Sequence, residues 1–150
     1  MKLEDELKQY KFKDDYQRAL LNIIFTAGWV GVGLSQVLKQ YDLSSQQFNV
    51  LRILRGSRPN PLNLLDIQER MMDRMSNATR LVEKLRQKGL LTRIQCEQNR
   101  RKVEIDITEK GIALLAELDP LIEENQRKMT ETITPEEARQ LDRLLDKLRG

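Results

Sequence analysis

The chain has 150 residues, of which 39% are hydrophobic and 33% charged, and this composition is typical of a single globular domain with its own core. It contains no histidine and one cysteine, which excludes histidine-based catalytic triads, the usual zinc sites and an internal disulfide framework. Adjacent acidic residues point in different directions on a helix, so they are poorly suited to acid–base catalysis, and we expect neither an enzyme nor a cofactor or metal site.

Nothing in the sequence predicts export or a membrane span. The most apolar run, residues 23–34, is too short to cross a bilayer. The amino-terminal stretch MKLEDEL is acidic where a signal peptide would be basic. A single cysteine also fits a reducing compartment. We therefore expect a cytoplasmic protein that does not contact a membrane.

A first long helix is predicted from a stripe of apolar residues between Tyr16 and Val37. These residues recur at alternating steps of four and three, as one face of an α-helix requires. The acidic residues Asp14 and Asp15 suit the amino-terminal end of the helix. The predicted helix covers residues 14–40.

Two shorter helices are predicted next. Ser44 and Gln47 form the pattern of a capping box, and the helix that they start ends at Gly56. The sequence Arg-Pro-Asn-Pro at 58–61 cannot continue a helix. Asn63 then has the position of a helix cap and starts a short third helix.

A fourth helix and a β-hairpin follow. Asp73 is predicted to cap the helix, which ends at Lys88 before Gly89. Residues 90–95 and 101–107 are predicted as two strands, because apolar and polar residues alternate along the second segment.

Two helices are predicted in the carboxy-terminal part, residues 109–149. Thr108 caps the first, whose apolar positions continue to Ile122, with a bend expected at Pro120. The second has a strong start signal, because Thr134 is followed by proline and two glutamates.

Basic charge is concentrated between Arg74 and Lys102. This segment contains nine basic and two acidic residues, a net charge of +7, whereas residues 103–150 carry −5. Such a segment suits a phosphate backbone, although a solvated surface could carry the same charge. All seven aromatic residues precede residue 49, so the basic segment has no side chain to stack on single-stranded bases. If the target is nucleic acid, we expect a duplex.

Two short helices, a tight connection and a hairpin form the pattern of a winged helix-turn-helix. The predicted fold is therefore mainly α with a small β-hairpin wing. The helix after Asp73 is the expected recognition helix, and the hairpin tip would reach a neighbouring phosphate or the minor groove. The candidate DNA-binding residues are Ser76, Asn77, Thr79, Arg80 and Lys84 in the helix, and Arg100, Arg101 and Lys102 in the wing.

The chain resembles the MarR family of bacterial transcription regulators. The segments that carry the resemblance are LSSQQFNVLRIL (43–54), LDIQERM (65–71), SNATRLVEKLRQKGLLTR (76–93) and NRRKVEIDITEKG (99–111). The resemblance implies one domain over residues 1–150, with a winged helix DNA-binding lobe at 44–108 and dimerisation helices at 14–40 and 109–149. It also implies a homodimer that binds a pseudo-palindromic operator in double-stranded DNA, usually as a repressor released by a small ligand or an oxidant.

The aromatic residues suggest where an effector would bind. By the resemblance, their region lies between the dimerisation helices and the DNA-binding lobe. Tyr16, Trp29 and Phe48 could line an apolar cleft there for a small aromatic or apolar anionic effector. Equally, these three residues could simply fill the core.

The wing departs from the family pattern at two residues. Asn99 stands where the family usually has aspartate, and asparagine cannot form an ion pair with Arg93. The thiol-based sensors of the family carry their cysteine in the first helix, whereas Cys96 lies at the wing. Arg93 and Arg100 would favour its thiolate, so Cys96 is either an inert wing residue or a redox switch.

The alternative function is that of a winged-helix adaptor that binds protein through the same face. An adaptor would tolerate loss of the wing charges and would show little dependence on salt. Binding to DNA, in contrast, weakens steeply as salt rises.

Overall fold

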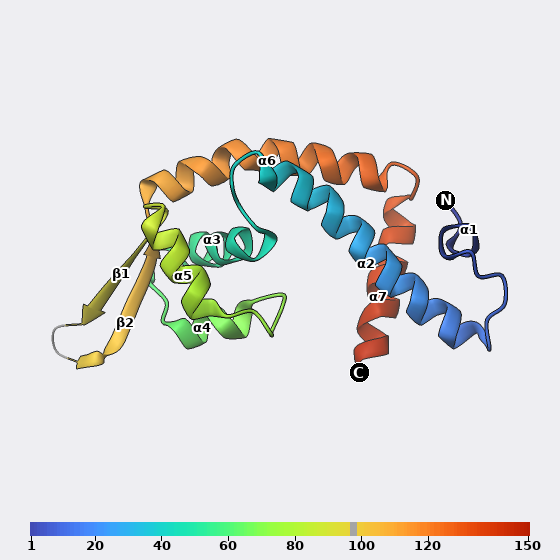
Figure 1. Ribbon diagram of the computed structural model, residues 1–150, viewed down its shortest axis with the longest axis horizontal. Coiled ribbons are helices and arrows are strands. Elements are labelled where there is room, and N and C mark those ends of the chain that lie inside the picture. Colours follow the sequence, from blue (N-terminus) through green and yellow to red (C-terminus); the bar gives the residue numbers. More distant parts are fainter. Residues whose placement is uncertain (97–98) are drawn as a thin grey trace.

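The computed structural model describes the backbone of residues 1–96 and 99–150, and the side chains of residues 1–95 and 103–150. The elements follow in the order α1 (Leu3–Leu7), α2 (Asp15–Lys39), α3 (Ser45–Ser57), α4 (Leu64–Arg70), α5 (Ala78–Gln87), β1 (Leu91–Cys96), β2 (Asn99–Ile107), α6 (Glu109–Thr130) and α7 (Pro135–Arg149). Figure 1 shows an arch: α3, α4, α5 and the hairpin form a lobe at one end, α7 and the start of α2 stand at the other, and α6 runs along the top.

The core lies inside the lobe and draws on all of its elements. The residues with no exposed surface are Leu38, Val50, Leu51, Leu54, Ile67, Leu85, Ile105, Leu115 and Leu118. They come from the end of α2, from α3, α4, α5 and β2, and from the first half of α6. Burying each such side chain stabilises the fold by about 1.5–3 kcal/mol. This shared core fixes the position of α5 relative to α3 and α6.

The hairpin has the predicted alternation. In β2, Ile105 and Ile107 are buried, and they pair with Arg93 and Leu91 of the antiparallel strand β1. Leu62, just before α4, exchanges two backbone hydrogen bonds with Ile105, at 2.9 and 2.8 Å. The base of the hairpin is therefore anchored to the lobe, while its tip extends away from it (Figure 1).

Four predicted helix caps are confirmed. The capping side chain accepts a hydrogen bond from the backbone N–H three residues later at Ser44, Asn63, Thr108 and Thr134. Helix α6, for which a bend was expected at Pro120, continues through this residue to Thr130. These starts could be recognised because capping depends on residues that are close in sequence.

The predicted start of the recognition helix at Asp73 is wrong. Helix α5 begins at Ala78, and Asn77 is its cap, with its side-chain oxygen accepting from the Arg80 backbone N–H at 3.0 Å. Asp73 instead accepts a hydrogen bond from the Met75 N–H within the turn after α4. Both residues are good caps, and the turn that reverses the chain between the two helices occupies the residues between them.

Gly111 lies where α6 leaves the lobe. A Cβ atom at this position would lie 2.3 Å from the carbonyl oxygen of Leu90 and 2.7 Å from the Ile107 side chain. No larger residue fits without moving the backbone. This close approach explains the glycine three residues after the Thr108 cap.

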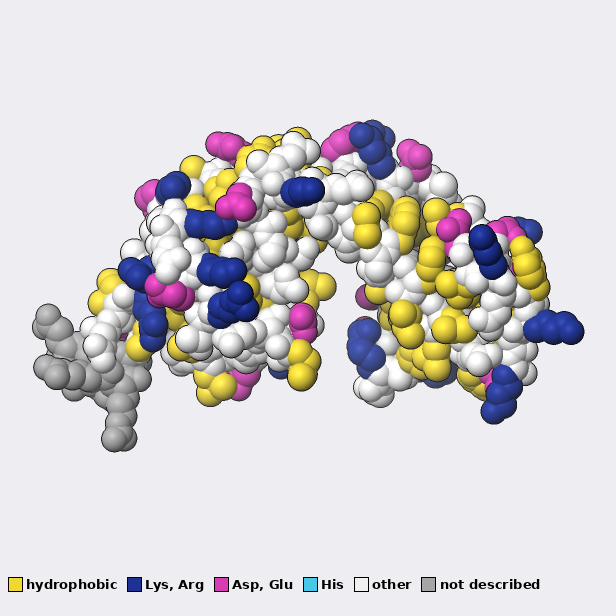
Figure 2. Space-filling model, viewed as in Figure 1, with side chains coloured by type: hydrophobic (Ala, Val, Ile, Leu, Met, Phe, Trp, Pro, Cys, Tyr) yellow, Lys and Arg dark blue, Asp and Glu magenta, His cyan; other side chains and the backbone are white. Residues whose placement is uncertain are grey.

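The terminal helices leave wide apolar faces uncovered. Helix α7 contains no buried residue, and in α2 only Leu38 is buried. Helix α2 is long and apolar enough to cross a membrane, judged by length and composition alone. The apolar run at residues 23–34 is shorter than this helix and gave no such indication. Figure 2 shows hydrophobic side chains gathered on this end of the arch.

The short helix α1 was not predicted. Its Leu3 is buried, and Glu4 forms an ion pair with Arg18 of α2 at 2.7 Å. These contacts hold a helix that is too short to be stable alone.

Candidate nucleic-acid interface

Helix α5 turns one side to the core and the other to solvent. Its buried side consists of Ala78, Val82 and Leu85. Thr79, Arg80 and Lys84 are exposed, so the chain presents these three candidate DNA-binding residues on the accessible side.

The other two candidates of the helix, Ser76 and Asn77, precede its first turn. The Asn77 side-chain oxygen caps the helix, which leaves only its amide NH₂ group free to donate to a ligand. The hydroxyl oxygen of Ser76 is buried and makes no hydrogen bond within the described part of the chain. Ser76 therefore differs from the exposed residues that follow it.

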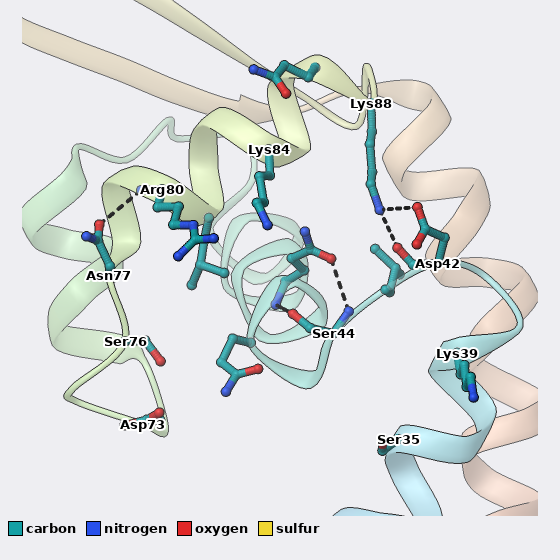
Figure 3. A pocket seen from close by; sticks show the side chains of 15 residues that line it. Ser35, Lys39, Asp42, Ser44, Asp73, Ser76, Asn77, Arg80, Lys84 and Lys88 are labelled. Carbon is teal, nitrogen blue, oxygen red and sulfur yellow. Dashed lines mark hydrogen bonds and ion pairs between the residues drawn. The ribbon is translucent and has the colours of Figure 1, made fainter.

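A cleft opens between α5, the start of α3 and the end of α2 (Figure 3). Its volume is about 830 Å³. The charged residues that line it are Lys39, Asp42, Asp73, Arg80, Lys84 and Lys88. In Figure 3, Arg80 and Lys84 of α5, and Lys88 directly after it, extend toward Ser44 and Asp42 on the opposite wall. Four cations and two acids make the cleft electropositive.

Only one of the cations in the cleft forms an ion pair within the described chain. Lys88 lies 2.8 Å from the Asp42 carboxylate and also donates to the Asp42 carbonyl oxygen. The hydrogen bond from Lys88 lowers the pKa of Asp42. Lys39, Arg80 and Lys84 form no ion pair among the described residues, although the charge of Lys84 makes a smaller contribution to lowering the pKa of Asp42, so these cations are more available to an anionic ligand than Lys88.

On another part of its exposed surface, α5 neutralises one of its own cations. Arg86 donates two hydrogen bonds to the Glu83 carboxylate, at 3.0 and 2.8 Å. The hydrogen bond from Arg86 lowers the pKa of Glu83 to about 2, with a smaller contribution from the charge of Arg93 in β1. Arg86 is thus less available to phosphate than Arg80 or Lys84.

Lys39 was not among the candidates from the sequence. It ends α2, far from α5 in sequence, and lines the same cleft as Arg80 because Leu38 is anchored in the lobe core. Lys88 belonged to the basic segment, but its pairing with Asp42 depends on the fold. No local pattern connects α2 with the recognition helix, so only a contact between the two segments could have indicated Lys39.

The wing candidates Arg100, Arg101 and Lys102, and the possible redox residue Cys96, have side chains outside the described residues. The backbone of 99–102 belongs to β2 at the far end of the hairpin from the lobe.

The three aromatic candidates for an effector pocket are not brought together within one chain. Tyr16 is 84% exposed and Trp29 is 40% exposed, whereas Phe48 is buried at 4%. Thirteen residues separate Tyr16 from Trp29 on α2, which is about 20 Å along a helix. Phe48 lies in the lobe core, with the Arg52 guanidinium 5.8 Å from its ring centroid.

A smaller cavity of about 270 Å³ lies beside Phe48, between α3 and α6. It is bounded by Arg55 and Asp119, which form a bidentate ion pair with N–O distances of 2.7 and 3.0 Å. This hydrogen bonding lowers the pKa of Asp119 and raises that of Arg55. The pair links the lobe to the long helix of the arch.

A helix with exposed cations, packed beside a two-stranded hairpin on a small helical lobe, defines a winged helix-turn-helix protein. Comparisons of the chain with known proteins support this class. The MarR family model matches residues 43–103. Over 116 residues the chain is 31% identical to the HTH-type transcriptional regulator PecS of Dickeya dadantii (strain 3937), covering 77% of this chain and 70% of PecS.

Two further comparisons extend the likeness. Over 110 residues the chain is 29% identical to the homoprotocatechuate degradative operon repressor of Escherichia coli, with 73% of each chain covered. A crystal structure of a MarR transcription factor from Planctomyces limnophilus is 29% identical and matches with a TM-score of 0.70, over 91% of this chain and 98% of that chain. This chain belongs to the MarR family and is a DNA-binding transcription regulator.

Proposed function

We propose that the protein acts as a homodimeric repressor on a pseudo-palindromic operator, with α5 in the major groove and the wing beside it. The observation that carries this proposal is the set of cations Lys39, Arg80 and Lys84, which face one cleft without an ion pair among the described residues. Unpaired cations beside a recognition helix suit the phosphates on either side of a groove, and an arginine on the helix itself can also reach a base edge.

The uncovered faces of the terminal helices support the homodimer. At least half of the side-chain surface is exposed at Leu20, Ile24 and Val32 of α2 and at Leu141 and Leu144 of α7. A contiguous apolar surface of this kind usually marks an interface. We propose that a second copy of the chain covers it, and that the protein is cytoplasmic, with no part of α2 in a membrane.

A small effector is proposed to regulate the dimer. Tyr16 and Trp29 are exposed about 20 Å apart on α2, and Phe48 borders a cavity lined mainly by charged and polar side chains, so an apolar site would require side chains from a second copy of the chain. An aromatic or apolar anion would suit such a site. An effector can weaken DNA binding only if it prefers a dimer whose recognition helices are wrongly spaced, and a tenfold effect requires about 1.4 kcal/mol of preference. Quenching of Trp29 fluorescence by aromatic acids, repeated with operator present, measures this coupling.

Selection of bound fragments from random duplex DNA tests the proposal directly. A symmetric motif should emerge, because a dimer presents two recognition helices. If some 6–8 phosphates are neutralised per dimer, the slope of log affinity against log salt should be roughly −5 to −7.

Three variants distinguish the contacts. Arg80→Ala should relax the preference at one position of each half-site and cost about 1–3 kcal/mol per contact, as expected for a base contact. Lys39→Ala and Arg101→Ala should weaken all duplexes evenly and flatten the salt slope. Unchanged affinity in all three variants would favour the protein-binding adaptor.

A further inference from the structure

The most exposed apolar side chains of the lobe lie in the turn between α4 and α5, and the terminal helices do not explain them. Met72 and Met75 are 87% and 93% exposed, and both lie in the turn between α4 and α5. The preceding residue, Met71, is 2% exposed and inserts into the core. Figure 1 shows this turn low on the side of the lobe that faces the other end of the arch, whereas the hairpin extends from the opposite side of the lobe.

The turn is held in a fixed conformation by side chains from α3 and α4. The Met72 N–H donates to the Asn49 side-chain oxygen at 2.9 Å. Gln68 donates to the carbonyl oxygen of Arg74 at 2.9 Å. The Asp73 carboxylate accepts from the Met75 N–H at 3.0 Å. The two thioethers therefore project into solvent from an ordered backbone, and exposing them gives the isolated chain no packing energy.

Charge around the turn identifies the kind of partner. Within five positions of the two methionines the exposed charged residues are Glu69, Arg70, Asp73, Arg74 and Arg80, a net charge of +1, and the three arginines form no ion pair within the described residues. Apolar side chains flanked by free cations match a groove whose walls are phosphates and whose floor carries apolar groups. In a helix-turn-helix, the residues at the amino-terminal end of the recognition helix approach the base edges. Met75 lies three residues before the first residue of α5.

The apolar group that a duplex offers in the major groove is the C5 methyl of thymine. We propose that Met75, with Met72 beside it, contacts thymine methyl groups of the operator and selects thymine at those positions. The inference rests on the proposed placement of α5 in the major groove. An unbranched, polarisable thioether can adjust its rotamers to cover a methyl group.

The expected effect is modest for each contact. Removing one methyl group from a buried apolar contact corresponds to about fourfold in affinity, and two equivalent half-sites give about sixteenfold.

Substitution of thymine by deoxyuridine tests the proposal, because the two bases differ only by the C5 methyl. Using the operator selected from random duplex, single thymines are replaced in turn and the affinity of the full-length protein is measured. The wild type should lose about fourfold at one or two thymines of each half-site. Met75→Gln, which is similar in size but polar, should bind thymine and deoxyuridine equally at the main position. Met75→Leu, the apolar control, should retain the discrimination.

Three results would overturn this proposal without overturning the proposed function. In the first, the wild type binds every deoxyuridine-substituted operator as tightly as the thymine operator. DNA binding is then intact, and only the thymine contact is refuted. Another is undiminished discrimination in Met75→Gln, which would assign the methyl contact to a different residue. A change of oligomeric state in Met75→Gln would show that the methionines are covered by a second copy of the chain. If the wild type enriched no duplex at all, both this proposal and the proposed function would fail.

Discussion

Replacing Leu144 of α7 by glutamine should weaken the proposed homodimer strongly. Leu144 is 57% exposed, so a partner that covered it fully would remove just over half of the side chain from water. Full burial of leucine contributes about 1.5–3 kcal/mol, so the remaining fraction contributes about 0.9–1.7 kcal/mol. A symmetric interface contains this residue twice, and the loss of about 1.7–3.4 kcal/mol raises the dimer Kd by roughly 20- to 300-fold.

Sedimentation velocity over a dilution series measures this change. Leu65→Gln is the matched control, because Leu65 is 64% exposed but lies on α4 in the lobe. Circular dichroism should be the same for both variants, since α7 contains no buried residue. A dimer of unchanged Kd in Leu144→Gln, or equal weakening in Leu65→Gln, would refute the assignment of α7 to the interface.

Three other predictions follow from the contacts of the lobe. Glu83→Gln should free Arg86 from its ion pair and so tighten binding to any duplex. The slope of log affinity against log salt, measured by fluorescence anisotropy at several salt concentrations, should become steeper by about one per half-site. Unchanged binding would show that Arg86 faces away from DNA. Arg55 lowers the pKa of Asp119, so the ion pair stabilises the fold at pH values above the ordinary carboxyl pKa of 3.8, and this contribution is lost as the pH falls through the lowered pKa. Asp119→Asn should therefore remove this acid dependence from the free energy of unfolding measured in urea. The cost of the substitution should be below about 1 kcal/mol, because both side chains are over one-third exposed. Gly111→Ala should lower the free energy of unfolding by about 1–3 kcal/mol, because its Cβ would lie 2.3 Å from a carbonyl oxygen, and a stabilised variant would contradict this geometry.

Helix starts and the hairpin could be predicted because their signals are local. The caps at Ser44 and Thr134 depend on a side chain and an N–H only three residues apart. The alternation that buries Ile105 is likewise visible in a short stretch of sequence. The error at Asp73 has the same origin, because two good caps lie within four residues and local chemistry does not distinguish them. The path of the turn after α4 selects Asn77.

The candidate interface required the fold. The exposed cations of α5 could be predicted from its apolar periodicity and its charge, because both can be read within this one segment of the sequence. Which of these cations are free depends on distant partners: Asp42, from the loop after α2, neutralises Lys88, while Lys39 adds a cation from the same helix end. The Asp42–Lys88 pair joins residues more than forty positions apart, and it forms only when the shared core places the end of α2 across the cleft from α5. A linear pattern contains the charges but no information on the distances between them.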